Sequence, residues 1–197
     1  GDRDRPPRAG NPSRSNTRGV LFFYTATERG ECYNDDMHMN EANEPLFIDT
    51  GANTPRADLP FIERQAITAL VRNPRTGEYL GLRWKEIDWE TFITGGIEDG
   101  QTAEEAARAE IQEESGYKNL RLVRELPRYH SKFYHGPKGV NRFAHFTSFL
   151  FELEDEAREE VSAEEHQRHE CVWLSASELK VFRLPEGHRF LFDNINT

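Results

Sequence analysis

The feature that most constrains the fold is a glutamate-rich helix, predicted over residues 102–115 and bounded by glycine on both sides. The segment is rich in Ala and Glu and free of Gly and Pro, as a stable helix interior requires. Thr102 is the expected N-cap, with Glu105 three residues later as in a capping box. Gly116 is the expected C-terminal stop. A short strand that ends at Gly95 precedes the helix, so the chain passes from sheet to helix within a few residues.

Strand-like segments surround this helix, and together they predict a mixed α/β fold. Apolar or alternating runs bounded by turn residues indicate strands. The expected strands are residues 66–71, 79–84, 91–94, 119–125, 128–135, 142–153 and 171–174. Ser175 is the expected cap of a further helix, and the charged residues 154–168 are expected to form a loop. Many strands with few helices favour layers of helix packed against a sheet.

Composition divides the chain into three parts. Residues 1–18 are basic, rich in Pro, Gly, Ser and Asn, and nearly free of large apolar side chains, so they are predicted to be a disordered tail. Residues 19–60 are predicted to be an N-terminal arm, with an apolar strand at 19–27 and a short apolar patch at 46–48. Residues 61–197 are predicted to form the main domain.

Charge and cysteine usage exclude several classes of protein. The formal net charge is −10, so the phosphates of nucleic acid repel the chain on average. The two cysteines, Cys32 and Cys171, lie far apart and do not support a disulfide framework. We find no apolar run of membrane-spanning length and no segment with the order of a signal peptide. These features predict a soluble protein in a reducing, cytoplasmic setting.

Three glutamates on the predicted helix form the candidate catalytic and metal site. Glu110, Glu113 and Glu114 are three or four residues apart, so they lie on one helical face. Clustered carboxylates repel one another and raise each other's pKa unless a cation lies among them. Mg²⁺ takes hard oxygen ligands and keeps several waters. The alternative is a solvated acidic face, and the helix alone does not decide between the two.

The order of these residues resembles the Nudix box. In that family pattern a glycine is followed by five residues, a glutamate, seven residues, Arg-Glu, an aliphatic residue, any residue, Glu-Glu, any residue, a glycine and an aliphatic residue. Residues 95–117 match the pattern at Gly95, Glu110, Ile111, Glu113, Glu114 and Gly116. They depart from it where the first glutamate is Gln101, the arginine is Ala109 and the last aliphatic residue is Tyr117.

The resemblance implies a Nudix fold, in which a mixed sheet lies between helices, and hydrolysis of a phosphoanhydride bond. Glu110, Glu113 and Glu114, with the carbonyl of Gly95, would bind Mg²⁺ or Mn²⁺. The bound ion would lower the pKa of a water molecule and neutralise charge on the diphosphate. Water would then attack phosphorus and split a nucleoside diphosphate that is linked to another moiety.

Ala109 leaves a second hypothesis open, because in the family the box arginine holds the following glutamate. The protein would then be a Nudix-like binding or accessory module with weak or no hydrolysis. The stretches FIERQAITALVRN, KFYHGPKGVNRFAHF and HECVWL are similar to Nudix-like segments inside some bacterial leucyl-tRNA synthetases. The chain lacks the synthetase's nucleotide-binding signatures, so aminoacylation by this chain alone is not expected. An excised insertion of that kind is the alternative, and tRNA is the one nucleic-acid partner that it implies. Nudix proteins often dimerise, and a homodimer is a further hypothesis.

Cationic and aromatic residues downstream of the box are the candidate substrate-binding residues. Strand alternation places Arg128, His130, Lys132 and Tyr134 on one face, and Arg142 follows. Such side chains bind phosphates and stack on a base, which fits a nucleotide-type small molecule as substrate. The alternative is an exposed edge strand kept soluble by its charges.

Two glutamates before the last strand, Glu164 and Glu165, are the candidate general bases. The alternative for them is a solvated loop. His166 and His169 have helical spacing but lack the partner cysteines or histidines of a zinc signature, so a zinc site is not expected.

Overall fold

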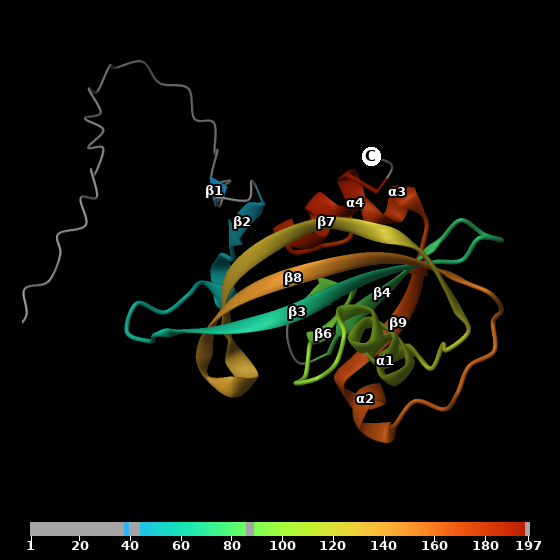
Figure 1. Cartoon of the computed structure of the whole chain (residues 1–197), viewed down its shortest axis with the longest axis horizontal. Coiled ribbons are helices and arrows are strands. Elements are labelled where there is room, and N and C mark those ends of the chain that lie inside the picture. The colour runs from blue at the N-terminus through green and yellow to red at the C-terminus, as the bar shows by residue number, and fades with distance from the viewer. Residues whose placement is uncertain (1–37, 40–43, 86–88, 196–197) are drawn as a thin grey trace, which may run out of the picture. The chain divides into compact units, whose positions relative to one another are not determined.

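The computed structural model describes residues 38–39, 44–85 and 89–195 of the chain (Figure 1). The tail predicted at 1–18 and the strand predicted at 19–27 lie outside these residues. The division of the chain into tail, arm and domain therefore stays a prediction.

One mixed sheet joins the strands of the described residues. The strands are β1 His38–Met39, β2 Pro45–Ile48, β3 Phe61–Arg72, β4 Tyr79–Trp84, β5 Glu90–Thr91, β6 Ile93–Gly96, β7 Leu120–His135, β8 Val140–Leu153 and β9 His169–Leu174. Their order is β1-β2-β7-β8-β3-β4-β5, with β6 paired to β3 and β9 paired to β4. β3 runs parallel to β8 along its whole length, whereas β7 and β8 are antiparallel.

Helices lie on both sides of this sheet. They are α1 Ala103–Ser115, α2 Ala163–Arg168, α3 Ala176–Leu179 and α4 Glu186–Asp193, with short 3-10 turns η1 Gly51–Asn53 and η2 Gly136–Lys138. Figure 1 shows α1 on one side of the sheet and α3 and α4 on the other, so the predicted sandwich is confirmed. None of the helices in the described residues is long and apolar enough to span a lipid bilayer.

Two apolar cores fill the spaces between the sheet and these helices. β3 contributes to both, because its side chains alternate between the two faces. Ala66 and Leu70 belong to the core that includes residues of α3 and α4. Ile67, Ala69 and Val71 belong to the core that includes residues of α1. The alternation thus packs α1 against β3, β6 and β8.

The predicted helix ends of α1 are confirmed. Thr102 accepts a hydrogen bond from the Glu105 amide, and the Glu105 side chain accepts one from the Thr102 amide, so the capping box is complete. Gly116 ends the helix in the left-handed conformation, with φ of 77°. Ser175 also caps its helix as expected.

Three parts of the expected layout were wrong. Residues 154–168 include α2, because Ser162 accepts a hydrogen bond from the Glu165 amide and starts a helix there. The two strands expected at 119–125 and 128–135 are one strand, β7, with register shifts on either side of Leu126. Pro127 has no N–H to donate, so the chain bulges there instead of ending the strand. Helix α4 was not expected.

Part of the predicted arm belongs to the sheet. The apolar patch at 46–48 lies in β2, which pairs in parallel with β7 at Leu46↔His130 and Ile48↔Lys132. Phe47 between them is buried, and its ring packs edge-on against Tyr129 at 5.9 Å between centroids. The described part of the arm therefore completes the main domain.

Candidate active site

The carboxylate of Glu110 lies directly against the backbone of β6. A Cβ atom at Gly95 would overlap that carboxylate, so glycine is needed to admit it. Helix α1 packs on β6 and β3 through buried Ala106, Ala107 and Ile111. This packing turns the glutamate-bearing face of the helix toward the end of β6.

Burial sets the protonation of these glutamates. Glu114 is buried, and its Oε2 atom has no hydrogen-bond partner. Burial, and then Glu110 and Glu165, raise the pKa of Glu114 well above its ordinary value. Burial, and then Glu113, raise the pKa of Glu110 to about 7. Glu113 itself is exposed. The cluster holds more negative charge than its surroundings stabilise, and a cation would correct this.

Helix α2 adds a further carboxylate to the same place. Glu165 is buried, and its Oε1 atom accepts a hydrogen bond from Arg168 at 2.6 Å. Its Oε2 atom makes no hydrogen bond and lies 3.4 Å from His169 Nδ1. The other candidate base, Glu164, is exposed and does not line the cavity described below. Of the two, only Glu165 is brought beside the glutamates of α1.

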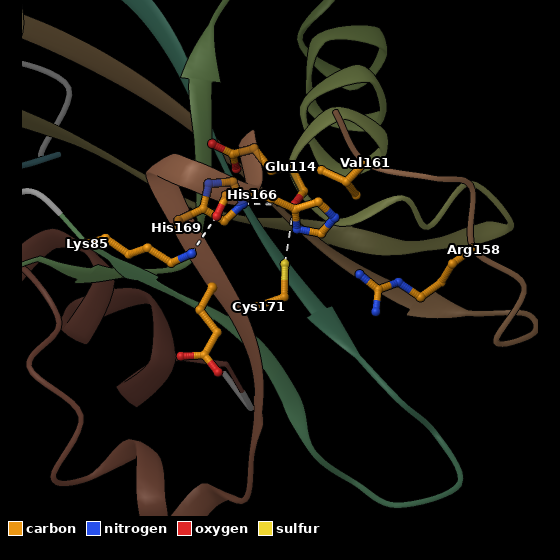
Figure 2. Close-up of a pocket in the computed structure, with 8 residues that line it drawn as sticks. Lys85, Glu114, Arg158, Val161, His166, His169 and Cys171 are labelled. Carbon is orange, nitrogen blue, oxygen red and sulfur yellow. Dashed lines mark hydrogen bonds between the residues drawn. The ribbon is translucent and has the colours of Figure 1, made fainter. Parts of the chain in front are cut away.

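A small cavity on the other side of Glu114 shows how the end of α1 is held (Figure 2). The backbone carbonyl of Glu114 lies 2.9 Å from His169 Nε2 and accepts a hydrogen bond from the Cys171 thiol at 3.3 Å. Burial raises the pKa of the Cys171 thiol to about 11, so it is neutral. These contacts from β9 fix the last turn of α1, and they make Cys171 a poor nucleophile.

The carboxylates open into a larger cavity of about 450 Å³. Its acidic residues are Glu110, Glu113, Glu114 and Glu165. Its basic residues are Arg64, His135, Lys138, Arg142 and Arg168. Its aromatic residues are Trp84, Trp89, Phe133 and Phe146. The cavity thus combines groups for a cation, groups for phosphates and flat apolar surfaces.

The structure places one of the five predicted substrate-binding residues, Arg142, on this cavity wall. Phe133 and His135 of β7 line the cavity too, so alternation turns His130, Lys132 and Tyr134 to the opposite side of the strand.

The fifth candidate, Arg128, is exposed beside the bulge of β7 and does not line the cavity. Lys132 and Tyr134 have other contacts. The ammonium group of Lys132 lies 4.8 Å from the ring centre of Phe143, and Arg56 lies over the ring of Tyr134 at 3.7 Å. These residues are not brought together with the glutamates.

Comparison with known proteins identifies the family. The model of the NUDIX domain matches residues 63–195. The chain belongs to the Nudix hydrolase family. Members of this family act on pyrophosphate bonds. None of the curated proteins matches the chain.

Solved structures agree with the Nudix fold. The E. coli dihydroneopterin triphosphate pyrophosphohydrolase is 19% identical over 69% of this chain and 99% of its own, with a TM-score of 0.50. A C. elegans Ap4A hydrolase is 16% identical over 67% of this chain and 94% of its own, with a TM-score of 0.52. The NUDIX domain of Shewanella oneidensis NrtR, solved with ADP ribose, is 10% identical over 68% and 86%, with a TM-score of 0.52. At these identities the likeness concerns the fold.

The departures from the Nudix box have visible consequences. Ala109 is exposed, and Arg108 does not replace the missing arginine, because it donates to Glu104 and to the carbonyl of Leu120. Arg168 of α2 acts on the cluster instead, since its charge lowers the pKa of Glu114. The side chain of Gln101 accepts a hydrogen bond from the Glu98 amide at 3.2 Å.

Two contacts of Arg64 at Gly95 and Gly96 of β6 were not predicted from the sequence. The Arg64 guanidinium lies where a Cβ atom at Gly96 would be, and its Nη2 donates to Glu98 at 3.0 Å. Its charge also lowers the pKa of Glu110, although burial outweighs it. The second glycine of the pair was the available signal. Trp89 and Lys138 reach the cavity through the tertiary fold, and no local pattern in the sequence predicted that they would line it.

The donor set suits a divalent cation. Within residues 38–39, 44–85 and 89–195, no three acidic, histidine or cysteine side chains form a ready-made metal cage. Two observations nevertheless fit an ion. Glu114 and Glu165 each bury an oxygen without a partner, and Gly95 leaves the Glu110 carboxylate a place that a side chain would fill. Such hard oxygen donors match Mg²⁺ and Mn²⁺.

Proposed function

We propose that this Nudix protein is a Mg²⁺- or Mn²⁺-dependent pyrophosphohydrolase that cleaves a nucleoside diphosphate linked to another moiety. Glu110, Glu113 and Glu114, with the carbonyl of Gly95, would hold the ion. The observation that carries the proposal is the buried, unpartnered oxygen of Glu114 at the wall of a cavity that also holds basic side chains. A binding module has no need of such a costly group.

The bound ion would supply Lewis acidity to the diphosphate and to water. The basic residues of the cavity would hold the remaining phosphate charge, and Arg142 is the predicted residue among them. Trp89 and Phe133 would give a nucleobase its apolar contact, since their rings already meet edge-on at 6.2 Å between centroids. This arrangement supports a nucleotide-type substrate. Two proteins of similar fold are named for such molecules, one solved with ADP ribose and one an Ap4A hydrolase.

Glu165 is the proposed proton acceptor. Arg168 holds the Oε1 atom at 2.6 Å, whereas the Oε2 atom makes no hydrogen bond and lies 3.4 Å from His169 Nδ1, so Oε2 would accept the proton. The water oxygen would form a bond to phosphorus as the phosphoanhydride P–O bond breaks, and the water proton would pass to the carboxylate. The leaving phosphate departs with the bonding electrons, so the step needs no redox partner.

A substrate screen tests the proposal. The protein is incubated with Mg²⁺ or Mn²⁺ and ADP-ribose, dinucleoside polyphosphates, NADH or nucleoside triphosphates, and phosphate-containing products are measured. We expect cleavage of at least one substrate class, lost on chelation of the metal. Glu114→Gln should lower the rate by at least about 100-fold, because it removes a charged ligand.

Glu104→Gln is the matched control, since it lies on the same helix outside the cavity and pairs with Arg108. It should leave the rate within about twofold. Activity that survives Glu113→Gln and Glu114→Gln would remove the site assignment. No turnover together with no metal binding would favour the accessory-module hypothesis that Ala109 raises.

A further inference from the structure

One end of the candidate-site cavity is basic. We call it the basic rim, and it consists of His135 at the end of β7, Lys138 in η2 and Arg142 in β8. Burial, and then the charges of Lys138 and Arg142, lower the pKa of His135, so these three side chains lie close to one another. Within the described residues, neither Lys138 nor Arg142 forms an ion pair with an acidic side chain. The rim therefore offers charge that the fold itself does not neutralise.

His135 adds a directed hydrogen-bond donor to the rim. Its Nδ1 atom accepts a hydrogen bond from the Lys138 amide at 3.3 Å. In the neutral ring the hydrogen therefore lies on Nε2. The lowered pKa of His135 favours this neutral form. The rim thus combines two positive charges with one neutral N–H donor.

The rim lies far along the sheet from the glutamates. The Glu110 carboxylate lies against Gly95, which pairs with Ile67 of β3, and Ile67 in turn pairs with Thr147 of β8. Arg142 precedes Thr147 in the same strand by about 16 Å, at the usual rise of about 3.3 Å per residue. The glutamates and the rim would therefore hold different parts of one substrate.

The aromatic contact proposed for a nucleobase lies beside the rim. Phe133 and Arg142 are directly paired in the register of β7 and β8, so their Cβ atoms are about 5 Å apart on one face of the sheet. The centroid of the Phe133 ring lies 6.3 Å from that of His135 and 6.2 Å from that of Trp89. A nucleobase at this contact would bring its ribose within reach of the rim.

The charge of the rim indicates which group it would take. The proposed divalent ion at the glutamates would neutralise the diphosphate that is cleaved. Lys138 and Arg142 would then still lack an anion. A phosphate monoester carries a charge of about −1.5 to −2 and three acceptor oxygens. Such a group matches two positive charges and one N–H donor.

We propose that the basic rim binds a phosphate monoester on the ribose of the substrate. This inference rests on the proposed function and narrows its substrate class to nucleoside diphosphate derivatives whose ribose carries an additional phosphate. Lys138 and Arg142 would hold the charge of that phosphate, and His135 Nε2 would donate to one of its oxygens.

Binding of small nucleotides in the presence of a chelator tests the rim without turnover. AMP, ADP, adenosine 2′,5′-bisphosphate and adenosine 3′,5′-bisphosphate are titrated into the full chain by calorimetry. We expect one bisphosphate to bind at least about tenfold more tightly than AMP, because it adds charge-assisted hydrogen bonds. It should also bind more tightly than ADP, which carries its two phosphates in one chain. The tighter bisphosphate shows which ribose hydroxyl carries the phosphate.

Substitutions assign this affinity to the rim. Lys138→Gln should remove most of the advantage of the bisphosphate over AMP, because half of the charge of the rim is lost. Arg75→Gln is the matched control, since this exposed arginine lies between β3 and β4 outside the cavity, and it should keep the advantage. Equal binding of AMP and both bisphosphates, tighter binding of ADP, or an advantage that survives Lys138→Gln would overturn the proposal.

Hydrolysis of matched substrates separates this inference from the proposed function. NADPH against NADH compares a 2′-phosphate with none, and coenzyme A against its 3′-dephospho form compares a 3′-phosphate with none. We expect kcat/KM to be at least about tenfold higher for the phosphorylated member of the pair that matches the tighter bisphosphate, mainly through a lower KM. Equal kcat/KM within both pairs would overturn the rim proposal and leave the hydrolase standing. A bisphosphate preference without turnover of any substrate would overturn the hydrolase and support the rim.

Discussion

The buried polar groups beside α4 differ in kind from those beside α1 and α2. On the side of α4, the Phe92 amide donates to His188 Nδ1 at 3.1 Å. The Tyr129 hydroxyl lies 2.8 Å from the Thr68 hydroxyl within the same core, so this pair is also satisfied. Burial lowers the pKa of His188 to about 3, which keeps the ring neutral.

On the side of α1 and α2, the buried polar groups are left incomplete. Glu114 and Glu165 each have a carboxylate oxygen without a partner. Buried polar groups in native proteins are nearly always paired, because an unpaired one costs about 1–3 kcal/mol. Beside α4 the buried atom without a partner is the neutral hydroxyl oxygen of Ser148, whereas beside α1 and α2 such atoms include carboxylate oxygens that a bound cation would complete.

The largest effect is expected for Glu165→Gln. Loss of the proposed proton acceptor should lower kcat by about 10²–10⁴-fold, the usual contribution of a general base. Glu164→Gln, one residue away and exposed, should leave kcat nearly unchanged. Steady-state kinetics on the best substrate of the screen measures both. Equal effects of the two substitutions would show that Glu165 has no special role.

The opposite side of the sheet should respond in stability instead. His188→Leu removes the acceptor of the Phe92 amide and should lower the free energy of unfolding by about 1–3 kcal/mol. Chemical denaturation measures the free energy of unfolding. The kcat of the folded variant should be unchanged. An unchanged midpoint of unfolding would show that this hydrogen bond contributes nothing.

The same substitution has a pH signature. The pKa of His188 is about 3 in the folded protein and near 6.5 when unfolded. The unfolded chain therefore binds the extra proton first, and stability is lost as pH falls below about 6.5. His188→Leu should make the stability less sensitive to pH between about 6.5 and 3.

A smaller effect of opposite sign is expected for Glu110→Gln in the metal-free protein. The pKa of Glu110 is about 7 when folded against an ordinary value of 4.5, so its charge destabilises the fold above about pH 7. Glu110→Gln should raise the free energy of unfolding at pH 8 by on the order of 1 kcal/mol, after discounting for solvent screening.

This gain should fade as pH falls toward 4.5, where the carboxyl is protonated in both states. Glu104→Gln, on the same helix outside the cavity, is the control. Thermal unfolding at several pH values with a chelator present measures both. Destabilisation by Glu110→Gln at pH 8 would contradict the proposed strain in the carboxylate cluster.

The smallest effect is expected for Ala109→Arg, which restores the box arginine. Ala109 is exposed, so a longer side chain has room. Arg168 already reaches Glu165, and its charge acts on Glu114, so the gain in activity should be only about two- to fivefold. Lower or unchanged activity would count against the assigned role of that position.

Local signals in the sequence were sufficient for the helix and its ends. Thr102, Glu105 and Gly116 act through neighbours in the chain, so the capping box and the left-handed stop of α1 could be predicted. The face of three glutamates could also be placed from helical spacing. The bulge at Pro127 could not, because the pairing with β8 carries the strand through a residue that suggests a break.

The rest of the site depends on contacts between distant segments. Glu165 and Arg168 reach α1 only because α2 forms and β9 pairs with β4. The face of β7 that lines the cavity depends on which side of the sheet carries α4. Alternation along the strand places His130 and Lys132 on one face. It does not tell which face of the strand lies toward the glutamates.

Manganese binding tests the central claim most directly. Crystals soaked in Mn²⁺ should show anomalous density beside the carboxylates of Glu110, Glu113 and Glu114, within bonding distance of at least two of them. An ion at this position would coordinate carboxylate oxygens that the fold leaves without hydrogen-bond partners. Crystals without an ion at this position, or with these side chains turned into bulk solvent, would contradict the account.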